Sequence, residues 1–543
     1  MKKLLLVFLS IVFSIPGISQ SWDKETKVVS SDRNAQDRMG NAVSVSGNYA
    51  IVGAYWEDED PAGLNTMSAA GASYIFEKNA EGNWLEVQKL VASDRSQRGG
   101  GDEFGYSVSI SGSYAIVGAR YKDEDASGGR YMANAGSAYI FERDQAGVWI
   151  EVEKLQPVEE ARYNINFGES VCISGNYAIV GASDEPEDAM GEEYKWAAGA
   201  AYVFERDISG NWNLVQKLVT SDRTAYDFFG ISVAISGSYA LVGASNEEED
   251  VAGGNNLNRA GSAYVFERNS GGEWLEKQKI ISSDRAANDI FGISVSLSGS
   301  YAIVGAHWED EDALGENSVN AAGSAYIFER DAIGSWNQTQ KIVGVDRSGG
   351  DVFGEKVCVE GDYAIVGSRV ESHDASGENL LRAAGGAHIF KRNEAGIWNH
   401  MEKIVPSDRE YGDSFGSSVA ISGNTALIGA TLEDHDLQGG NFMGDAGSAY
   451  FYETLSTGIY DDEMISSIVV YPNPTTGIVY IDGGDTSELI TITLRNIVGQ
   501  VIVNRSRMAG KIISIDIPGP RGFYLLEVVT SDQKHKRIRI LKQ

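Results

Sequence analysis

Cysteine and proline are scarce in this sequence, and each shortage excludes a class of protein. The chain has 2 Cys in 543 residues, so it is not a disulfide scaffold, and we interpret Cys172 and Cys358 as free thiols in a core. It has 63 Gly but 9 Pro, which suits short strands and tight turns better than a linker or a collagen. Because 42% of residues are hydrophobic, a large core is available and an all-β protein is predicted.

Long apolar stretches are absent apart from the N-terminus. Residues 1–19 combine a dibasic start, a short apolar stretch and small residues before Gln20, which predicts a cleaved secretory signal peptide. No cysteine lies near that point, so a lipid anchor is disfavoured. No later stretch approaches the roughly 20 apolar residues of a membrane helix, so we expect no membrane span in the mature chain.

A repeat of about 62 residues fills most of the chain. The pair Phe-Gly marks six copies, at Phe104, Phe167, Phe229, Phe291, Phe353 and Phe415, and Met39-Gly40 marks a variant seventh. Each copy has four apolar segments, exemplified by SVAIS, YALVGA, SAYVFER and WLEKQKII, separated by turn formers. Four antiparallel strands per copy predict the blades of a seven-bladed β-propeller.

A tryptophan opens the fourth strand of each copy and indicates how the ring closes. The last copy ends at YFYE without a tryptophan, whereas Trp22 precedes Lys27 by the same five residues as in the other copies. We therefore expect the N-terminal segment to supply the outer strand of the last blade, which removes an exposed edge. The repeat tryptophans are Trp22, Trp84, Trp149, Trp212, Trp274, Trp336 and Trp398.

The pattern F-G-x-S-V…Y-A-I-V-G-A resembles the FG-GAP repeat of integrin α-like propellers and of bacterial surface proteins, over residues 22 to about 455. In that family a DxDxDG calcium loop joins the first two strands of a blade. Here the joint is a minimal turn such as Ser236-Gly237-Ser238, which cannot gather the ligands of a calcium ion. The resemblance implies that ligand binds on the opposite face.

The C-terminal segment 466–543 has another pattern, with short alternating strands that predict a small Ig-like β-sandwich. Its motifs YPNPTTG, RNIVGQ and GFYLLEV resemble the C-terminal sorting domain of type IX secretion cargo from Bacteroidetes-type bacteria. That resemblance implies contact with the type IX machinery and a secreted or outer-surface location; an ordinary adhesive sandwich is the alternative. We divide the chain into signal 1–19, propeller 20–457, linker 458–465 and sorting domain 466–543.

Acidic residues dominate the charge, and they lie in the propeller. The whole chain has a net charge of -32, whereas residues 466–543 hold 10 Lys and Arg against 6 Asp and Glu. An acidic propeller repels nucleic acid and favours cations or basic partners. In addition to the type IX secretion machinery, we expect an extracellular protein or polysaccharide to be a binding partner.

Acidic loops follow the second strand of every copy. One aspartate recurs three residues before a glycine, as in Asp312 and Gly315, which favours a turn role over weak calcium binding. In HWEDEDALGE (307–316) we interpret Glu309, Asp310 and Glu311 as a solvated edge. The calcium alternative would use Asp58, Asp60, Asp123, Asp125, Asp310, Asp312, Asp434 and Asp436.

Three further features of this face are candidates for function. The recurrent SDR segment between copies predicts Arg to carboxylate pairing between blades. His373 and His435 share a repeat position, which leaves a metal pair open as an alternative. Aromatic residues in the acidic loops either bind ligand by stacking or cover the blade tops, and the candidates are Trp56, Tyr121, Trp196 and Trp308.

No GxSxG, HExxH or CxxC motif occurs, and the blades are nearly alike, whereas catalysis needs different residues converging at one place. We therefore expect a non-catalytic binding or adhesion module without a cofactor, weak Ca²⁺ binding aside. The alternatives are an extracellular hydrolase or lyase with a site on the acidic-loop face, and a structural surface-layer protein.

Overall fold

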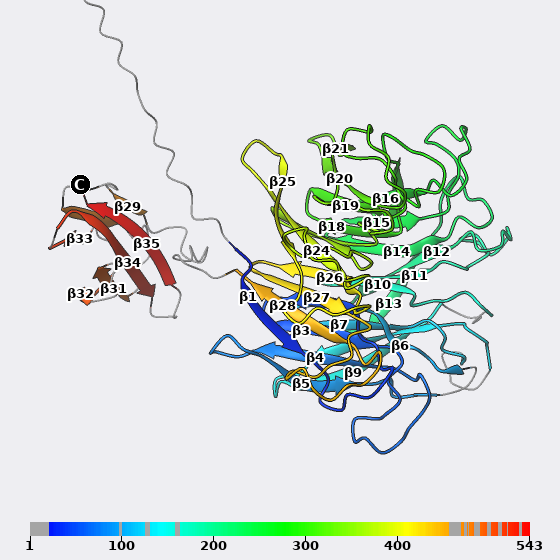
Figure 1. Ribbon diagram of the computed structural model, residues 1–543, viewed down its shortest axis with the longest axis horizontal. Coiled ribbons are helices and arrows are strands. Elements are labelled where there is room, and N and C mark those ends of the chain that lie inside the picture. Colours follow the sequence, from blue (N-terminus) through cyan, green and yellow to red (C-terminus); the bar gives the residue numbers. More distant parts are fainter. Residues whose placement is uncertain are drawn as a thin grey trace, which may run out of the picture. The chain divides into compact units, whose positions relative to one another are not determined.

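The computed structural model describes residues 21–96, 100–124, 131–157, 163–454, 469–471, 475, 477–482, 489–496, 501–508, 513–518, 520–530 and 535–542. The chain divides into two compact units: Ser21–Thr454, and a unit that contains the strands from Val469 onward (Figure 1). The predicted signal peptide and the predicted linker 458–465 lie outside the described residues. Across the described ranges no helix has the length and apolar character to cross a membrane.

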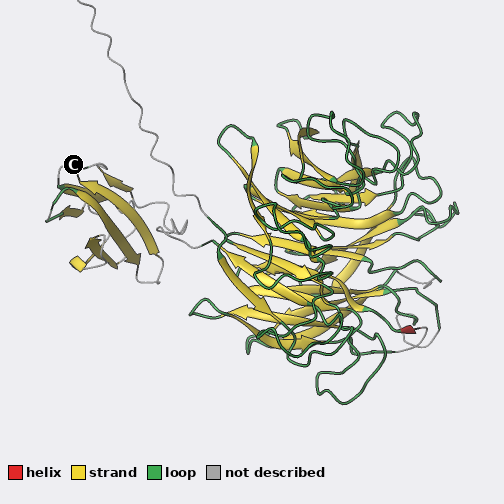
Figure 2. Ribbon diagram, viewed as in Figure 1, coloured by secondary structure: helices red, strands yellow, loops and turns green. Residues whose placement is uncertain are grey.

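The larger unit is a propeller of seven four-stranded antiparallel sheets, as predicted (Figures 1 and 2). Blade 1 comprises β2 (Met39–Ser46), β3 (Tyr49–Ala54), β4 (Ala72–Lys78) and β5 (Trp84–Leu90). Blade 2 comprises β6 (Phe104–Ser111), β7 (Tyr114–Ala119), β8 (Ser137–Arg143) and β9 (Trp149–Leu155). Blade 3 comprises β10 (Ser170–Ser174), β11 (Tyr177–Ala182), β12 (Ala200–Arg206) and β13 (Trp212–Leu218). Blade 4 comprises β14 (Phe229–Ser236), β15 (Tyr239–Ala244), β16 (Ser262–Arg268) and β17 (Trp274–Ile280). Blade 5 comprises β18 (Ser294–Ser298), β19 (Tyr301–Ala306), β20 (Ser324–Arg330) and β21 (Trp336–Ile342). Blade 6 comprises β22 (Lys356–Glu360), β23 (Tyr363–Ser368), β24 (Gly386–Arg392) and β25 (Trp398–Ile404), and blade 7 begins with β26 (Phe415–Ser422), β27 (Thr425–Ala430) and β28 (Ser448–Glu453).

The N-terminal strand β1 (Lys24–Val28) completes blade 7, which confirms the predicted closure. It pairs antiparallel with β28, from Lys24 opposite Glu453 to Val28 opposite Ala449. Trp22 is buried, its backbone N–H donates to Glu402 Oε2 at 3.0 Å, and its ring meets Tyr363 edge-on. The pairing covers the edge of β28, so blade 7 has four strands like the other blades.

The repeat tryptophans pack neighbouring blades together. Trp336 of blade 5 meets Tyr239 of blade 4 with ring centroids 5.9 Å apart, in the edge-to-face geometry that aromatic rings prefer. The same pairing joins Trp149 to Tyr49, Trp212 to Tyr114, Trp274 to Tyr177 and Trp398 to Tyr301. In blade 1 Trp84 stacks on Phe451 at 4.1 Å instead, since blade 7 has Thr425 where the other blades have tyrosine.

The glycines of the repeat let adjacent blades approach closely near the axis. A Cβ added to Gly305 of β19 would lie 1.8 Å from the carbonyl oxygen of Gly354, at the start of the next blade. Gly354 itself has φ +92°, which favours glycine over any L residue. The first strands of all seven blades surround a central channel that holds a cavity of about 190 Å³.

The smaller unit contains two antiparallel sheets. One is formed by β29 (Val469–Tyr471), β30 (Ile478–Asp482) and β33 (Ile513–Asp516); the other by β32 (Val501–Met508), β31 (Leu489–Asn496), β34 (Gly522–Thr530) and β35 (His535–Lys542). Buried side chains of both sheets, such as Ile481 and Leu526, belong to one hydrophobic core. A core between two packed sheets is a β-sandwich.

Candidate functional site

One face of the propeller collects every long loop. In an antiparallel blade, the acidic loop between the second and third strands and the connector from the fourth strand to the next blade lie at the same end. We call this end the loop face. In blade 5 its parts are the connector 281–293 and the acidic loop 307–323. The predicted ligand-binding and metal residues all lie on it, although Asp125 lies outside the described residues.

Asp312 shapes the acidic loop of blade 5. Its Oδ1 accepts the backbone N–H of Leu314 at 2.9 Å and of Glu316 at 3.1 Å, and Gly315 has φ +73°. These hydrogen bonds lower the pKa of the Asp312 carboxyl to about 2. They are the contacts that the turn interpretation predicts. The residues Asp60, Asp188, Asp250, Asp374 and Asp436 accept the same two N–H groups in their own loops.

Asp310 closes the other end of the same loop. Its Oδ1 accepts the backbone N–H of Ala321 at 2.7 Å, and its backbone carbonyl accepts Val319 N–H. Three of the other metal candidates accept the corresponding bond: Asp58 from Ala69 N–H, Asp123 from Asn134 N–H and Asp434 from Asp445 N–H. The carboxylates therefore have backbone partners within the loop.

Glu309 is buried, and the prediction of a solvated edge is wrong for it. Its side chain is covered by the blade, and its Oε2 accepts the Tyr326 hydroxyl at 2.5 Å. Lys341 Nζ lies 3.2 Å from Glu309 Oε2 and 2.7 Å from Asp284 Oδ2. The hydroxyl of Tyr326 also donates to Asp284 Oδ1 at 2.9 Å. Asp284, Glu309, Tyr326 and Lys341 thus form one buried tetrad.

The tetrad recurs around the ring and uses residues that lie far apart in a repeat. Blades 1, 4 and 7 have Asp32, Glu57, Tyr74 and Lys89; Asp222, Glu247, Tyr264 and Lys279; and Asp408, Glu433, Tyr450 and Lys27. In blade 2 Lys122 takes the place of the glutamate and pairs with Asp102 at 3.0 Å. A buried ammonium between two carboxylates compensates charges that would otherwise be costly to bury.

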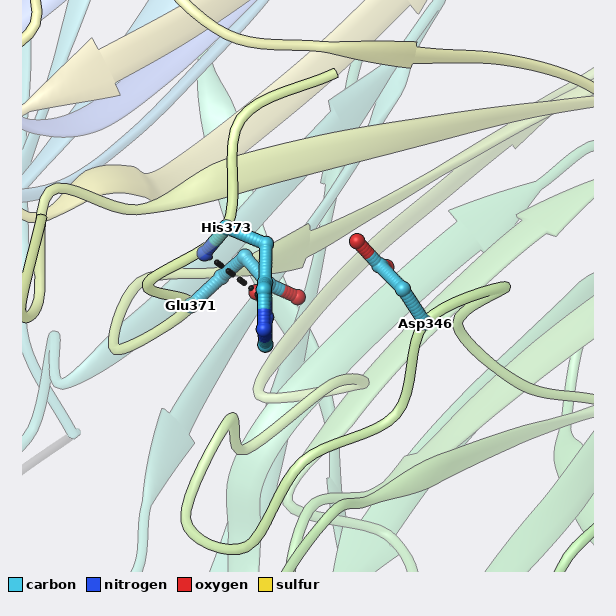
Figure 3. Close-up of side chains that lie close together, drawn as sticks. All are labelled: Asp346, Glu371 and His373. Carbon is cyan, nitrogen blue, oxygen red and sulfur yellow. Dashed lines mark hydrogen bonds and ion pairs between the residues drawn. The ribbon is translucent and has the colours of Figure 1, made fainter. Parts of the chain in front are cut away.

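The groups most like a metal site coincide with these tetrads. Three sets have ligand atoms within 4.8 Å of one another: Asp32, Glu57 and Glu59; Asp284, Glu309 and Glu311; and Asp346, Glu371 and His373 (Figure 3). In each set a lysine ammonium already contacts the carboxylates, for example Lys89 Nζ at 2.6 Å from Asp32 Oδ2. In the two sets made of carboxylates alone, the lysine ammonium takes the position that a cation would need, whereas in the third set Asp346 Oδ1 has no hydrogen-bond partner among the described residues.

A second buried carboxylate lies beside each tetrad. Asp289, in the connector of blade 5, accepts the backbone N–H of Ala286 at 2.6 Å. Burial, opposed by that bond and reinforced by the charge of Glu309, raises its pKa to about 7. Asp227, Asp351 and Asp413 also have a pKa raised to about 7, mainly by burial.

Most connector arginines bind backbone carbonyl groups, and the predicted pairing with a carboxylate between blades is found for Arg33, whose Nη2 lies 4.0 Å from Glu433 Oε2. Arg347, at the start of blade 6, donates to the backbone oxygens of Asp310 at 2.7 Å and Asn317 at 3.1 Å. Arg95 and Arg409 reach the preceding acidic loop in the same way. Arg347 links neighbouring blades, as expected of the connector arginines, but the atoms that accept its hydrogen bonds are backbone carbonyl oxygens of the preceding acidic loop.

The aromatic candidates differ in accessibility. Trp308 is 41% exposed and borders a pocket of about 570 Å³ between the connector and acidic loop of blade 5. Trp196 is 65% exposed and stands edge-on to Tyr194. The ring of Trp56 is covered by the Arg38 guanidinium at 3.9 Å, and Tyr121 lies 4.5 Å from that of Arg120. Trp196 and Trp308 are the most exposed of the four, although the Arg259 guanidinium lies 5.2 Å from the centroid of the Trp308 ring.

The pocket beside Trp308 is polar around the ring. Asn288 and Asn320 are exposed at its edge. Three of its four carboxylates, Glu309, Asp310 and Asp289, already have the structural partners described above, and the fourth is Glu311. An indole face with neighbouring amides can stack on a ligand and exchange hydrogen bonds with it. This arrangement is suited to recognition.

The channel cavity is lined by two charged residues that sequence reasoning missed, Glu169 and Lys356. Arg120 Nη1 lies 3.5 Å from Glu169 Oε1, and its Nε lies 2.8 Å from Glu103 Oε2. Lys356 lines the cavity at a position where five other blades have serine. Aligning the residues just after Phe-Gly would have identified this departure, because the serines bond the next blade, as Ser294 bonds the Gly354 carbonyl at 2.9 Å.

The remaining predictions concern cysteine and histidine. Cys172 and Cys358 are free thiols, as predicted, and each is partly buried in the first strand of its blade. His373 and His435 do not share a cluster among the described residues. His373 Nδ1 lies 3.1 Å from Glu371 Oε1, and His435 Nδ1 lies 3.6 Å from Glu433 Oε1, so each histidine contacts a glutamate of its own blade.

Comparison with known proteins identifies both parts of the chain. A family model described as FG-GAP repeat matches residues 22–76, 84–141, 149–204, 212–266, 274–328, 336–390 and 398–452, and one described as secretion system C-terminal sorting domain matches 469–542. No curated protein matches the chain. A crystal structure of a protein from Lactobacillus plantarum is 10% identical with a TM-score of 0.39, covering 86% of this chain and 99% of that one.

Proposed function

Because the chain belongs to the FG-GAP repeat family, whose propeller fold hosts unrelated functions, we propose its activity from the site: a non-catalytic binding module. The sorting domain indicates export by type IX secretion, with a secreted or cell-surface location. The ligand is an extracellular protein or polysaccharide that contacts the loop face at Trp308.

The observation that carries this proposal is the half-exposed Trp308 beside a pocket of about 570 Å³. An enzyme would need an acid, base or nucleophile free to meet substrate. Three carboxylates of this pocket are instead engaged: Glu309 by Tyr326, Asp310 by Ala321 and Asp289 by Ala286. This favours recognition by stacking and amide contacts over a hydrolase or lyase.

We also propose that the acidic loops hold their shape without calcium. In blade 5, Asp312 and Asp310 are bonded to backbone N–H groups, and the buried carboxylates contact Lys341. A calcium ion requires six to eight oxygen ligands and would have to displace these partners.

A glycan and matrix-protein array with the full chain tests the binding proposal. The expected result is binding to one ligand class that falls at least about tenfold in Trp308→Ala, the loss of a stacking contact of about 1.5 kcal/mol. Ile333→Ala is the control and should bind normally, because Ile333 is an exposed side chain in the turn between β20 and β21, at the end of the blade opposite the loop face. Binding that is unchanged in Trp308→Ala, or turnover of a bound glycan, would contradict the proposal.

A further inference from the structure

Blade 6 differs from its sisters at the tetrad. Asp346 lies in the connector that enters the blade, and Glu371 and His373 lie in its acidic loop (Figure 3). One ligand atom from each falls within 4.8 Å of the others. The other two sets of this kind contain carboxylates alone, so this set is distinguished by an imidazole.

The tetrad tyrosine is replaced by His388 in this blade. In blade 5 the Tyr326 hydroxyl donates to Asp284 Oδ1 at 2.9 Å and so satisfies that oxygen. The imidazole of His388 is shorter, and Asp346 Oδ1 is buried without a hydrogen-bond partner among the described residues. Blade 6 therefore has an unsatisfied acceptor where blade 5 has a saturated one, and such a group is costly to bury.

His388 itself adds a second unsatisfied group. It is completely buried, and its Nδ1 lies 3.2 Å from His400 Nε2. Its own Nε2 has no hydrogen-bond partner among the described residues. His388 holds the place from which the sister tyrosines reach the carboxylates, but it is not a member of the set whose ligand atoms lie within 4.8 Å of one another.

Two glycines leave space around these groups. Gly386 and Gly344 stand where blade 5 has Ser324 and Ser282. A Cβ on Gly386 would lie 3.2 Å from Glu371 Cγ, and one on Gly344 would lie 3.8 Å from His388 Nε2. Relative to blade 5, blade 6 therefore has a smaller side chain at three positions near these polar atoms: His388 for tyrosine, and Gly386 and Gly344 for serine.

From this geometry we propose that blade 6 binds a divalent transition-metal ion of the Zn²⁺ class through Asp346, Glu371 and His373, with His388 as an additional buried imidazole. Imidazole and carboxylate together suit Zn²⁺, whereas the carboxylate sets of the sister blades do not offer nitrogen. Lys403 Nζ contacts Asp346 Oδ2 at 2.6 Å, so Oδ1 is the oxygen left for the ion. The ion competes with this ammonium for the carboxylates.

Titration of the metal-free full chain with Zn²⁺ by calorimetry, and with Co²⁺ by visible absorption, tests the site. We expect one tight ion and a Co²⁺ spectrum that indicates nitrogen ligation. His388→Tyr restores the sister arrangement, and His373→Asn removes a ligand; each should weaken binding at least about tenfold. His435→Asn is the matched control and should bind as the parent chain does, since His435 belongs to no three-residue set among the described residues.

Absence of Zn²⁺ binding by the parent chain would overturn the proposal. Equal affinity in the parent, His388→Tyr and His373→Asn would also overturn it, because the ion would then lie elsewhere on the acidic surface. If His373→Asn fails to fold, His388→Tyr decides alone, since its tyrosine is the residue that blades 1, 4, 5 and 7 accommodate at this position.

Discussion

Lys27 Nζ lies 3.0 Å from Glu433 Oε2, so a lysine of the first strand compensates a buried carboxylate of the last blade. The same ammonium lies 2.7 Å from Asp408 Oδ2. Closure of the ring therefore depends on a charge contact as well as on the backbone pairing of β1 with β28. In the other blades the equivalent lysine comes from the same repeat, as Lys341 does in blade 5.

Replacing Lys27 with methionine should destabilise the propeller. The change removes the nearer cation of the buried Glu433 and leaves Arg33 Nη2 at 4.0 Å, at a cost of about 3 kcal/mol in the free energy of unfolding. Chemical denaturation of the full chain measures this cost. Lys277→Met is the control, because the Lys277 side chain is 44% exposed and its pairing with Glu267 is worth less than about 1 kcal/mol. Equal stabilities of parent and Lys27→Met would show that the contact contributes nothing to closure.

The repeat made the fold predictable from the sequence. Trp22 and Lys27 have the spacing of the tryptophan and lysine in every blade, so the ring closure could be inferred without coordinates. Asp312 and Gly315 were likewise predictable as a turn, because an aspartate that bonds its own downstream backbone acts locally.

The tetrad was not predictable because its members meet only in three dimensions. Asp284, Glu309, Tyr326 and Lys341 come from a connector, a loop and two strands, and nothing local distinguishes the buried Glu309 from the neighbouring Glu311. The connector arginines were assigned to carboxylates for the same reason. The sequence shows which side chains are charged, but any residue type can supply the backbone carbonyl oxygen that Arg347 binds, so this partner could not be identified from residue types.

The free energy of unfolding of the propeller should decrease as pH rises through neutrality. In the folded chain the pKa of Asp289 and Asp413 is about 7, and that of Asp37 about 8, against about 3.9 for an unfolded aspartate. The folded state therefore holds protons that the unfolded state has lost, and the stability that they contribute below pH 4 is lost as pH rises through 7 to 8.

Buried histidines act in the opposite direction but at lower pH. The pKa of His307 is lowered to about 4 by burial, so it adds stability as pH rises from 4 to about 6.5 and nothing further above that. Denaturant unfolding between about pH 6.5 and 9 isolates the aspartates, because the contribution of His307 no longer changes above about pH 6.5. The free energy should fall over that interval, and less steeply in Asp289→Asn. A free energy that rises over the interval would contradict these assignments.

Calcium dependence can be created by removing one lysine. In the parent chain Lys341 contacts Asp284 and Glu309, so added calcium should leave the unfolding midpoint unchanged. Lys341→Met leaves these carboxylates and Glu311 without the ammonium, with ligand atoms within 4.8 Å of one another. The variant should be less stable without calcium and should recover part of the loss at millimolar calcium, because the ion replaces the lost charge.

Thermal unfolding of both chains, first made free of metal and then measured with and without added calcium, provides the measurement. Lys277→Met should not respond to calcium, since its side chain is 44% exposed and lies outside the tetrads. A metal-free parent chain that gains stability from calcium would show that calcium supports the loops, and the proposal of calcium-free loops would be wrong. Rescue confined to Lys341→Met would establish that the lysine holds the position of a cation.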